Sequence, residues 1–484
     1  MRTFAAVDLG AQSGRVAVGR FDGEVLALEE LHRFPNEPVR VAGTLHWDVL
    51  RLYHEARAGL RRAGAVDSVA VDSWAVDFGL VDRSGRLLGN PVHYRNSSRA
   101  AAMEAALERV PKRELYERTG IQLLAINTVF ELAAMADDRD PALAAAHRLL
   151  LIPDLFAFWL CGSETTELTN ATTTGCLDAR SHEWTTDLLE RLDVPTGIFP
   201  KVVAPGTRLG ATADGVPFVA TATHDTAAAV AAVPLRGEGG AYLSVGTWSL
   251  VGLEAAEPVV TDAAYDANLT NEGGVEGTTR VLRNVTGLWL LHECRRVWAA
   301  AGNERSYDEL VALAGRSPAF GPLIDPDDPS FAEPGDMPAR IAAYCAATGQ
   351  GAPEGEAAVV RCILESLALK QAATIDALAA ATGRDIDTLH VIGGGAGNEL
   401  LCAWTAAAAG RPVLAGPVEA TLVGNLLVQA IALGELASIA EGRELVRRSF
   451  TPTVYEPDAE RSWREARERF AGLGARREAV EVGT

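Results

Sequence analysis

The sequence predicts an α/β protein that folds as two domains, and three observations lead to this fold class. First, 484 residues are too many for one ordinary hydrophobic core. Second, short runs rich in β-branched residues alternate with longer Ala-rich runs of helical character. Third, the strand-turn-strand pattern of residues 5–21 recurs at residues 241–253. We therefore expect domains at residues 1–236 and 237–484, divided where glycines and charges interrupt apolar sequence.

The N-terminus predicts a three-stranded antiparallel meander. Residues 5–9 form a short apolar strand, a tight polar turn follows, and strands at residues 16–21 and 24–34 complete the unit. Asp8 lies beside the glycine-containing turn, where a carboxylate can hold Mg²⁺ and backbone N–H groups can meet phosphate oxygens. Hairpin geometry alone would explain the same glycines.

A helix capped by Asp48 and running to about Ala63 comes next, followed by a strand at residues 68–73. Trp74 follows this strand and has an aspartate on either side. An apolar ring with polar neighbours suits a sugar. A half-buried core tryptophan gives the same pattern, so both interpretations stay open.

The pattern then becomes mainly helical. Helices are expected at residues 96–110 and 112–118, and the apolar stretch 127–161 predicts two packed helices. Residues 168–175, with the sequence LTNATTTG, predict a loop. Cap and turn chemistry would explain its many hydroxyl groups.

The stretch VPFVATATHDTAAAV places one acidic side chain where a strand gives way to a helix. Residues 216–221 predict a buried strand, and residues 227–233 are strongly helical. Asp225 therefore lies near a helix N-terminus, where partial positive charge favours the ionised carboxylate that a general base needs. An N-cap is the alternative, since Asp and Thr are favoured caps in any protein.

The second half predicts a further set of strands and helices. Asn284 lies in the segment 282–287, just ahead of an amphipathic helix. The segment TLHVIGGGAGN, residues 388–398, runs from a strand through three glycines into a helix, which suits a nucleotide. Its last residue is Asn398 where the dinucleotide pattern has glycine. The remaining predicted elements are helices at residues 288–301, 356–382 and 418–432, a strand at 413–417, and a charged helix after Asp458.

Composition excludes several classes of protein. A net charge of -20 repels polyanions and the arginines are scattered, so nucleic-acid binding is not expected. No long apolar window predicts a membrane span, and the N-terminus has no signal-like segment, so a cytoplasmic location is expected. The six cysteines lack zinc-site spacing and are expected as free thiols, although a bridge between Cys345 and Cys362 is conceivable.

The sequence lacks the phosphate loop of many nucleotide-binding proteins. No G-x-x-x-x-G-K-[ST] motif is present, and the only lysines, Lys112, Lys201 and Lys370, lie outside glycine-rich turns. Protein-kinase signatures, the G-x-S-x-G elbow and H-E-x-x-H are also missing. A nucleotide triphosphate would therefore be bound by backbone amides from turns, by hydroxyls and by a carboxylate-held Mg²⁺, as in actin-like folds.

Nine motifs in order resemble the FGGY family of carbohydrate kinases, and the resemblance covers nearly the whole chain. They are AVDLGAQSGRVAV, DSWAVDF, PVHYR, TNATTT, THDTAAAV, YLSVGTWSL, VLRNVTGLWLL, LHVIGGGAGN and AGPVEATLVGN. The resemblance implies two actin-like (ribonuclease H-like) domains with an interdomain cleft. It further implies a sugar-binding N-terminal domain, a nucleotide-binding C-terminal domain, and transfer of the ATP γ-phosphoryl group to the 1-hydroxyl of L-rhamnulose.

The resemblance also implies a role for individual residues. Asp225 matches the catalytic base, and Asp8 matches the aspartate expected near Mg²⁺. ATP would contact Ala11, Gln12, Ser13, Gly14, Arg15, Thr247, His292 and Gly394. The sugar would contact Ala75, His224, Asp225, Thr226 and Asn284. Two positions depart from the family pattern, since Ala75 replaces a glycine near the sugar and His292 replaces a glutamine linked to ATP.

Other substrates and one other class of protein remain open. L-fuculose, L-ribulose, xylulose or another small polyol could replace L-rhamnulose, because specificity rests on a few hydroxyl partners. A nucleotide-dependent sugar sensor or actin-like assembly protein without turnover is the alternative class, and an intact Asp225 with both phosphate turns argues against it. ATP and Mg²⁺ are the expected cofactors, and the sequence gives no sign of oligomeric state.

Overall fold

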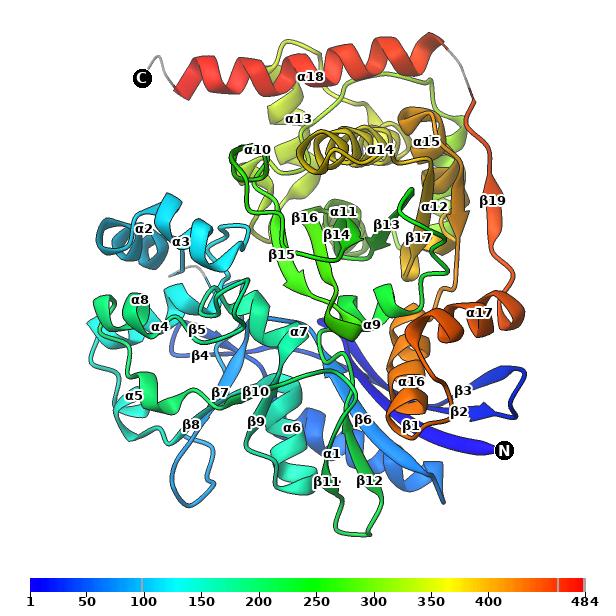
Figure 1. Ribbon diagram of the computed structural model, residues 1–484. Helices are drawn as coiled ribbons and strands as arrows, with labels where there is room; N and C mark the ends of the chain where they lie inside the picture. The colour runs from blue at the N-terminus through cyan, green and yellow to red at the C-terminus, as the bar shows by residue number, and fades with distance from the viewer. Residues whose placement is uncertain (97–98, 459–460, 482–484) are drawn as a thin grey trace. The chain divides into compact units, whose positions relative to one another are not determined.

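Figure 1 shows the computed structural model, which describes residues 1–96, 99–458 and 461–481. Two compact units make up the chain. Unit 1 consists of Met1–Pro234, Glu254–Leu282 and Glu419–Thr451, and unit 2 consists of Leu235–Leu253, Arg283–Val418 and Pro452–Thr484. Within the described ranges, every helix is too short or too polar to span a membrane.

Unit 1 is built on a six-stranded sheet in the order β11-β12-β6-β1-β2-β3. Its first three strands, β1 (Arg2–Leu9), β2 (Ser13–Phe21) and β3 (Leu26–Pro35), form the expected antiparallel meander. β6 (Ser68–Ser73) pairs parallel to β1, and β12 (Pro217–Ala220) pairs parallel to β6. β11 (Thr207–Ala211) closes the edge antiparallel to β12. This mixed order is the actin-like, ribonuclease H-like arrangement predicted from the family resemblance.

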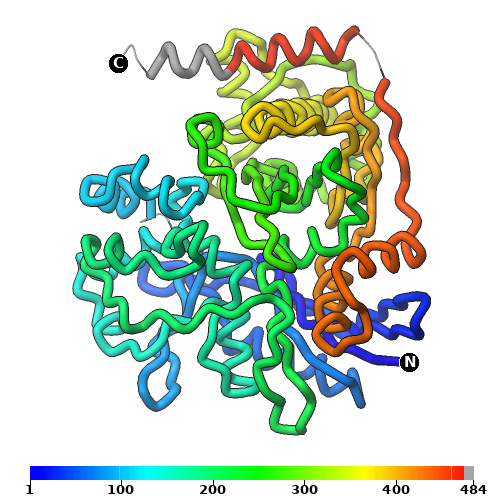
Figure 2. Tube along the Cα trace, in the orientation of Figure 1, coloured from blue at the N-terminus to red at the C-terminus, as the bar shows by residue number. Residues whose placement is uncertain are grey.

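Helices cover both faces of this sheet. On one face, Ala5, Val7 and Leu9 of β1 join a core with α1 (Val49–Ala63) and α6 (Ile152–Cys161). Successive strand residues point to opposite faces, so Asp8 lies on the other face. There α16 (Ala420–Ala432) packs against β1, β6 and α9 (Asp225–Ala231). In Figures 1 and 2 this late segment of the chain, coloured orange, lies beside the blue N-terminal strands.

A glycine allows α16 to approach α9 closely. A Cβ atom built on Gly424 would lie 1.7 Å from the carbonyl oxygen of Ala228, which is helix backbone and has little room to move. Gly424 therefore explains one position of the AGPVEATLVGN motif by packing. The next residue, Asn425, is directed at the sheet and donates to Asp72 at 2.6 Å.

We expect Gly424→Ala to destabilise unit 1. Overpacking of a closely packed interior costs about 1–3 kcal/mol, and here the added methyl meets backbone. The midpoint of urea unfolding should fall accordingly. Gly472→Ala is the matched control, because no atom of the described residues lies within 4 Å of the added Cβ and alanine favours helix. Equal midpoints for the two variants would contradict the packing argument.

Two expectations for unit 1 were wrong. Residues 127–161 contain α4 (Thr128–Asp137), α5 (Pro141–Ala145) and a strand, β8 (Arg148–Leu151), before α6, where only two helices were expected. Apolar residues of β8 pair with β7 (Phe78–Val81), and periodicity alone cannot separate a short buried strand from a helix. Residues 168–175 form α7 (Leu168–Ala171) and a 3₁₀ turn, η1 (Thr172–Thr174), where a loop was expected. Their threonine hydroxyls bond to carbonyls three residues back, which stabilises the turns.

The other expected elements of unit 1 are confirmed, including the Asp48 cap, which accepts from the amide of Arg51. Residues 97–98 of the expected helix at 96–110 lie outside the described residues. The remaining helices and strands are β4 (Val39–Val41), β5 (Thr44–His46), α2 (Arg99–Arg109), α3 (Lys112–Thr119), β9 (Thr165–Glu167), α8 (Thr186–Arg191), β10 (Lys201–Val203), α10 (Asp262–Asp266), β15 (Thr270–Gly273) and α17 (Ile439–Ser449).

Unit 2 repeats the strand scheme of unit 1. β13 (Gly240–Val245) and β14 (Trp248–Ala255) form a hairpin, and β17 (Thr388–Ile392) pairs parallel to β13. β18 (Val413–Ala415) is parallel to β17, and β19 (Thr453–Tyr455) is antiparallel to β18. The predicted recurrence of the strand-turn-strand pattern at residues 241–253 is therefore confirmed.

The helices expected in the second half are also present. β16 (Thr279–Thr286), which begins in unit 1, leads into α11 (Trp289–Ala300). The other helices of unit 2 are α12 (Tyr307–Arg316), α13 (Met337–Ala347), α14 (Gly355–Thr382), α15 (Glu399–Ala409) and α18 (Arg461–Glu481). All six cysteines of the chain are free in the structure.

Candidate active site

Three carboxylates of unit 1 lie together at the carboxyl ends of the parallel strands of its sheet. Asp8 and Asp72 are paired residues near the carboxyl ends of β1 and β6. Asp225 begins α9, shortly after β12, and an isolated bridge joins Ser73 to His224. Because β1, β6 and β12 are parallel, their carboxyl ends lie at the same end of the sheet. The fold thereby brings the predicted base and the predicted metal residue into one site.

Arg15 supplies a positive charge to this group. It faces Asp8 across the β1–β2 hairpin and forms ion pairs with Asp8 and Glu419. Burial acts to lower the pKa of Arg15, but the two carboxylates outweigh it and raise that pKa. Arg15 therefore keeps its charge and offsets part of the repulsion among the aspartates.

Asp72 is a buried carboxyl group that the sequence did not mark as a site residue. Its Oδ2 accepts from the Asn425 amide at 2.6 Å, and its Oδ1 is buried without a hydrogen-bond partner among the described residues. Burial, followed by the charge of Asp8, raises the pKa of Asp72 well above its usual range. The group is therefore protonated more readily than an ordinary aspartate.

Asp225 is the most accessible of the three, with 29% of its side chain exposed. Its Oδ1 accepts from the Thr226 hydroxyl at 3.1 Å and lies 3.4 Å from Nε2 of His224. Burial raises the pKa of Asp225, His224 opposes that shift, and the charge of Asp8 adds to it. The sequence showed only the helix N-terminus, which favours the ionised carboxylate, whereas burial and the like charge of Asp8 act in the opposite direction.

Asp225 is not the N-cap of its helix, which was the alternative interpretation. Asp225 is the first helical residue, and the N-cap is His224, whose side chain makes no capping hydrogen bond. Neither Thr223 nor Thr226 caps this helix by its side chain. The hydroxyl of Thr223 donates to Glu167 at 2.8 Å and that of Thr226 to Asp225.

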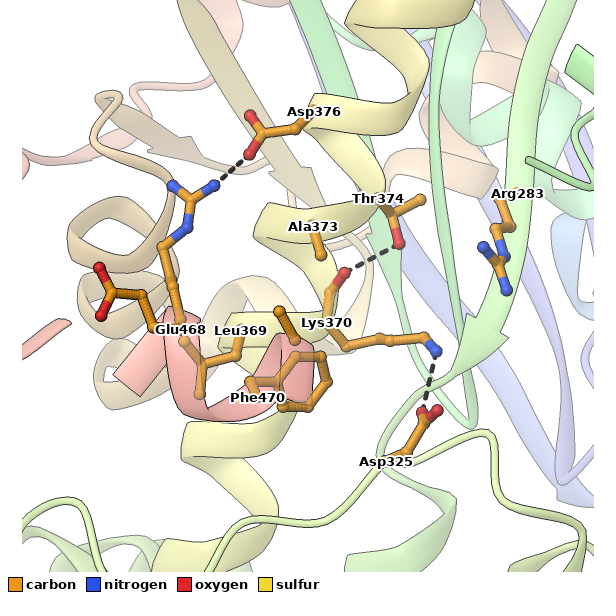
Figure 3. Close-up of a pocket in the computed structure, with 11 residues that line it drawn as sticks. Arg283, Asp325, Leu369, Lys370, Ala373, Thr374, Asp376, Glu468 and Phe470 are labelled. Carbon is orange, nitrogen blue, oxygen red and sulfur yellow. Dashed lines mark hydrogen bonds and ion pairs between the residues drawn. The ribbon is translucent and has the colours of Figure 1, made fainter. Parts of the chain in front are cut away.

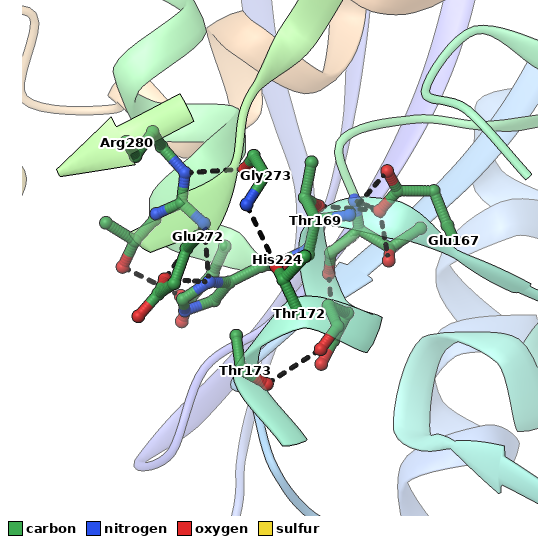
Figure 4. A network of polar contacts seen from close by, with 12 residues as sticks. Glu167, Thr169, Thr172, Thr173, His224, Glu272, Gly273 and Arg280 are labelled. Carbon is green, nitrogen blue, oxygen red and sulfur yellow. Dashed lines mark hydrogen bonds and ion pairs between the residues drawn. The ribbon is translucent and has the colours of Figure 1, made fainter. Parts of the chain in front are cut away.

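Glu167 anchors the turn that carries the site. Its carboxylate accepts from the amide and the hydroxyl of Thr223, both at 2.8 Å, and from the amide and hydroxyl of Thr169 at 2.8 and 2.6 Å. The Thr169 hydroxyl in turn accepts from the amide of His224 at 3.2 Å. Figure 4 shows these contacts around the labelled Glu167 and Thr169. Glu167, together with Thr169 of the polar run that predicted only a loop, therefore fixes the backbone immediately before Asp225.

Trp74 is a core residue. It is 5% exposed and packs 4.1 Å from the ring of Trp47, and both indole N–H groups donate to Asp77. The core interpretation is thus correct, and the sugar interpretation of this ring is not supported. Ala75 follows in the loop and is partly buried. The amide of Ser73 donates to the carbonyl of Thr223 at 2.9 Å, which ties this loop to the turn before His224.

The N-terminal turn is shorter than predicted. Ser13, Gly14 and Arg15 belong to β2, so only Gly10, Ala11 and Gln12 form the bend. A Cβ atom on Gly14 would lie 2.2 Å from the ring of Phe34. This glycine is therefore required for packing within the sheet.

Unit 2 brings its predicted nucleotide residues close to the end of β13. Thr247 lies in the β13–β14 turn, and its carbonyl accepts from the amide of Gly287, just before α11. Gly394 begins the 3₁₀ turn η5 (Gly394–Gly397), where a Cβ on the next residue, Gly395, would lie 2.4 Å from Val245. These three segments meet in close contacts that glycine permits.

His292 lies one turn into α11, and its ring contacts that of Tyr307 at 5.3 Å. Burial, together with the charge of Arg295, lowers the pKa of His292 to about 4. The ring is therefore uncharged at neutral pH, like the glutamine that the family pattern has at this position. Asn284 lies in β16, next to Arg283.

A cavity of about 540 Å³ lies elsewhere in unit 2, as Figure 3 shows. Arg283, Lys370 and Asp325 line it, and Lys370 donates to Asp325 at 2.9 Å. Thr247, His292 and Gly394 are not among its lining residues. Arg283 lines this cavity, whereas its neighbour Asn284 is not among the lining residues.

Comparison with known proteins identifies the chain's relatives. The model of the FGGY family of carbohydrate kinases, N-terminal domain, matches residues 3–231, and the C-terminal domain model matches residues 241–433. A rhamnulokinase of Bacteroides thetaiotaomicron is 42% identical over 475 residues, covering 96% of this chain and 97% of that protein. A rhamnulokinase of Klebsiella pneumoniae is 40% identical, covering 95% of each chain.

Solved structures support the fold. A xylulose kinase from Rhodospirillum rubrum has a TM-score of 0.80 at 19% identity and covers 99% of both chains. A glycerol kinase from Plasmodium falciparum, solved with ADP, has a TM-score of 0.76 at 15% identity and covers 99% of this chain and 98% of that one. At such low identity, the likeness establishes the two-domain α/β fold.

Proposed function

This chain belongs to the FGGY family of carbohydrate kinases, and we propose that it transfers the γ-phosphoryl group of ATP to the 1-hydroxyl of L-rhamnulose. Curated relatives of 42% and 40% identity that match it over nearly its whole length are rhamnulokinases, which supports this sugar. One observation carries the chemistry, namely a partly exposed carboxylate, Asp225, held at the carboxyl edge of the sheet beside Asp8.

In the proposed reaction Asp225 accepts the proton of the sugar hydroxyl. The hydroxyl oxygen forms a bond to the γ-phosphorus, the bond from that phosphorus to the bridging oxygen breaks, and ADP leaves. Such transfers pass through a loose transition state, so positioning and charge neutralisation matter more than a strong nucleophile. A carboxylate with a raised pKa is a stronger base when ionised, which fits its acceptance of a proton late in the reaction.

The sites of sugar and nucleotide are proposed from the family pattern. His224, Thr226, Ala75 and Asn284 would contact the sugar. The residues at 11–15, with Thr247, His292 and Gly394, would contact ATP. The run of glycines that packs against Val245 supports a nucleotide turn there, since bare amides can approach phosphate. The proposal places the reaction in the cytoplasm, where reducing conditions keep free cysteines as thiols.

Mg²⁺ fits the residues that are present. Among the described residues, no group of three or more His, Cys, Asp or Glu side chains is placed to hold a metal ion. Mg²⁺ usually binds one or two carboxylates and completes its shell with water and substrate phosphates, so a single carboxylate suffices. Asp8 would hold the ion, which when bound would neutralise charge on the phosphate oxygens.

We expect Arg15→Met to lower kcat/KM by about 10²–10³, the usual span for removing one donor that stabilises transition-state charge. The change also removes the cation that pairs with Asp8. Arg15→Lys should retain more activity because it keeps the charge. Arg20→Met, on the same strand and paired with Glu29 at the surface, is the control and should behave like the wild type. Full activity of Arg15→Met would contradict this role.

ADP release in a coupled assay tests the function directly. L-rhamnulose should give the highest kcat/KM when compared with L-fuculose, L-ribulose and xylulose at equal concentrations of ATP. Preference for another ketose would leave the proposed kinase activity standing and show that the substrate is a different sugar. Ala75, which adds a methyl group near the proposed sugar site, would then be the first residue to examine. Sugar binding without ADP release would instead indicate a sensor.

A further inference from the structure

A buried ion pair lies next to His224 and was not marked by the sequence. Glu272 of β15 and Arg280 of β16 are directly opposite each other in an antiparallel pair. Arg280 is fully buried, and its Nη2 lies 2.9 Å from Oε2 of Glu272. Figure 4 shows both side chains beside the imidazole of His224. Buried charges persist where they are paired and hydrogen-bonded, and the partners of this pair include the imidazole ring.

The hydrogen-bond geometry relates this pair to the imidazole ring. Arg280 donates through Nε to the carbonyl of Gly273 at 2.9 Å, and its Nη2 lies within hydrogen-bond distance of Nδ1 of His224, at 3.1 Å. A guanidinium has only donors and stays protonated in proteins. A hydrogen bond to this group therefore requires a lone pair on Nδ1. In a neutral ring the proton then lies on Nε2.

The position of that proton bears on Asp225. Nε2 of His224 lies 3.4 Å from Oδ1 of Asp225, and the Thr226 hydroxyl donates to the same oxygen. With its proton on Nε2, the ring presents an N–H group to Oδ1. Both of these neighbours engage Oδ1, which leaves Oδ2 as the oxygen directed to other partners.

We propose that Arg280 and Glu272 are positioning residues that hold His224 as the neutral Nε2–H tautomer, so that Oδ1 of Asp225 is held and Oδ2 accepts the substrate proton. This inference rests on the proposed role of Asp225 as the base. Arg280 selects the tautomer by donating to Nδ1, and Glu272 neutralises the buried charge of Arg280. The competing state is an imidazolium whose Nδ1–H faces Oε2 of Glu272 at 3.3 Å.

Nitrogen NMR of protein labelled with ¹⁵N-histidine distinguishes these states. The chain has nine histidines, and the signals missing from His224→Gln identify His224. At neutral pH we expect a pyridine-like shift for Nδ1 and a pyrrole-like shift for Nε2. Two pyrrole-like shifts, or the reversed pair, would overturn the proposal. The result for the wild type is independent of whether Asp225 is the base, which Asp225→Asn tests separately.

Kinetics test whether the tautomer matters. Arg280→Met should lower kcat by about 10–100-fold, as is usual when a supporting partner of a site residue is lost, with a smaller change in the KM for L-rhamnulose. The NMR signals of His224 should shift toward a mixture of tautomers. Arg280→Lys, which can still donate to Nδ1, should restore part of both. Arg113→Met removes an exposed arginine of the same unit and is the control.

If Arg280→Met does not fold, the double variant Glu272→Gln/Arg280→Met takes its place in these measurements, because it removes both buried charges together. A folded variant that keeps the wild-type tautomer and the wild-type kcat would overturn the positioning role. A folded variant that loses the tautomer and keeps kcat would overturn the link to Asp225.

Discussion

Asp225→Asn is expected to lower kcat by about 10²–10⁴, the span for losing a general base, while sugar binding survives. Asparagine has nearly the shape of aspartate and can still accept from Thr226, so the turn should keep its geometry. It cannot take up the proton of the sugar hydroxyl. Steady-state assays give kcat, and calorimetry with L-rhamnulose gives the affinity.

A control variant and a separate reading of affinity and turnover make this result specific. Asp187→Asn changes an exposed aspartate of the same unit and should leave kcat unchanged. Loss of sugar affinity in Asp225→Asn without loss of turnover would show that Asp225 binds the sugar and is not the base.

Glu167→Ala is expected to destabilise unit 1 and to impair catalysis together. It leaves the backbone amides of Thr169 and Thr223 without their acceptor in a buried site. Each unsatisfied buried donor costs about 1–3 kcal/mol, so the two amides amount to about 2–6 kcal/mol. The threonine hydroxyls can rotate toward other partners, whereas the amides cannot. The midpoint of urea unfolding measures this loss.

The same variant tests the link from stability to function. The freed Thr223 amide directly precedes His224, so Asp225 should move and kcat should fall even where the variant is folded. Glu164→Ala, three residues earlier in the chain, is the control, because its ion pair with Arg148 is at the surface and contributes at most about 1 kcal/mol. A Glu167→Ala protein with wild-type unfolding and kcat would show that this network does not position the site.

The sequence predicted the scaffold well because its signals are local. Alternating apolar residues and glycine turns predicted the meander of β1 to β3 and its repetition in β13 and β14. Asp8 and Asp225 were recognisable because Asp8 lies near the end of a strand beside a polar turn, and Asp225 lies where a strand gives way to a helix. The order of motifs then identified the family, which no single motif could do.

What the sequence did not predict depends on contacts between distant segments. The role of Glu272 and Arg280 could be recognised only from the structure, in which β15 pairs with β16 and brings both side chains to His224. Asn425 lies far along the chain from Asp72, to which it donates. The hairpin register that places Glu272 opposite Arg280 could have suggested an ion pair, but nothing local related it to His224.

The upward shift in the pKa of Asp225 was not predicted, for a related reason. Local sequence shows the helix start, which favours an ionised carboxylate, but it does not show burial or the approach of Asp8. Both of these arise from the sheet, where parallel strands end together. The strand β8 was missed because a short apolar run has no distinctive period.

A single-turnover measurement tests the central claim most directly. Enzyme in excess over ATP is mixed with saturating L-rhamnulose and quenched on the millisecond scale, and rhamnulose 1-phosphate is quantified. We expect the wild type to form product in one fast phase and Asp225→Asn to form it about 10²–10⁴ times more slowly. An equal rate for the two proteins would show that Asp225 takes no part in the chemical step.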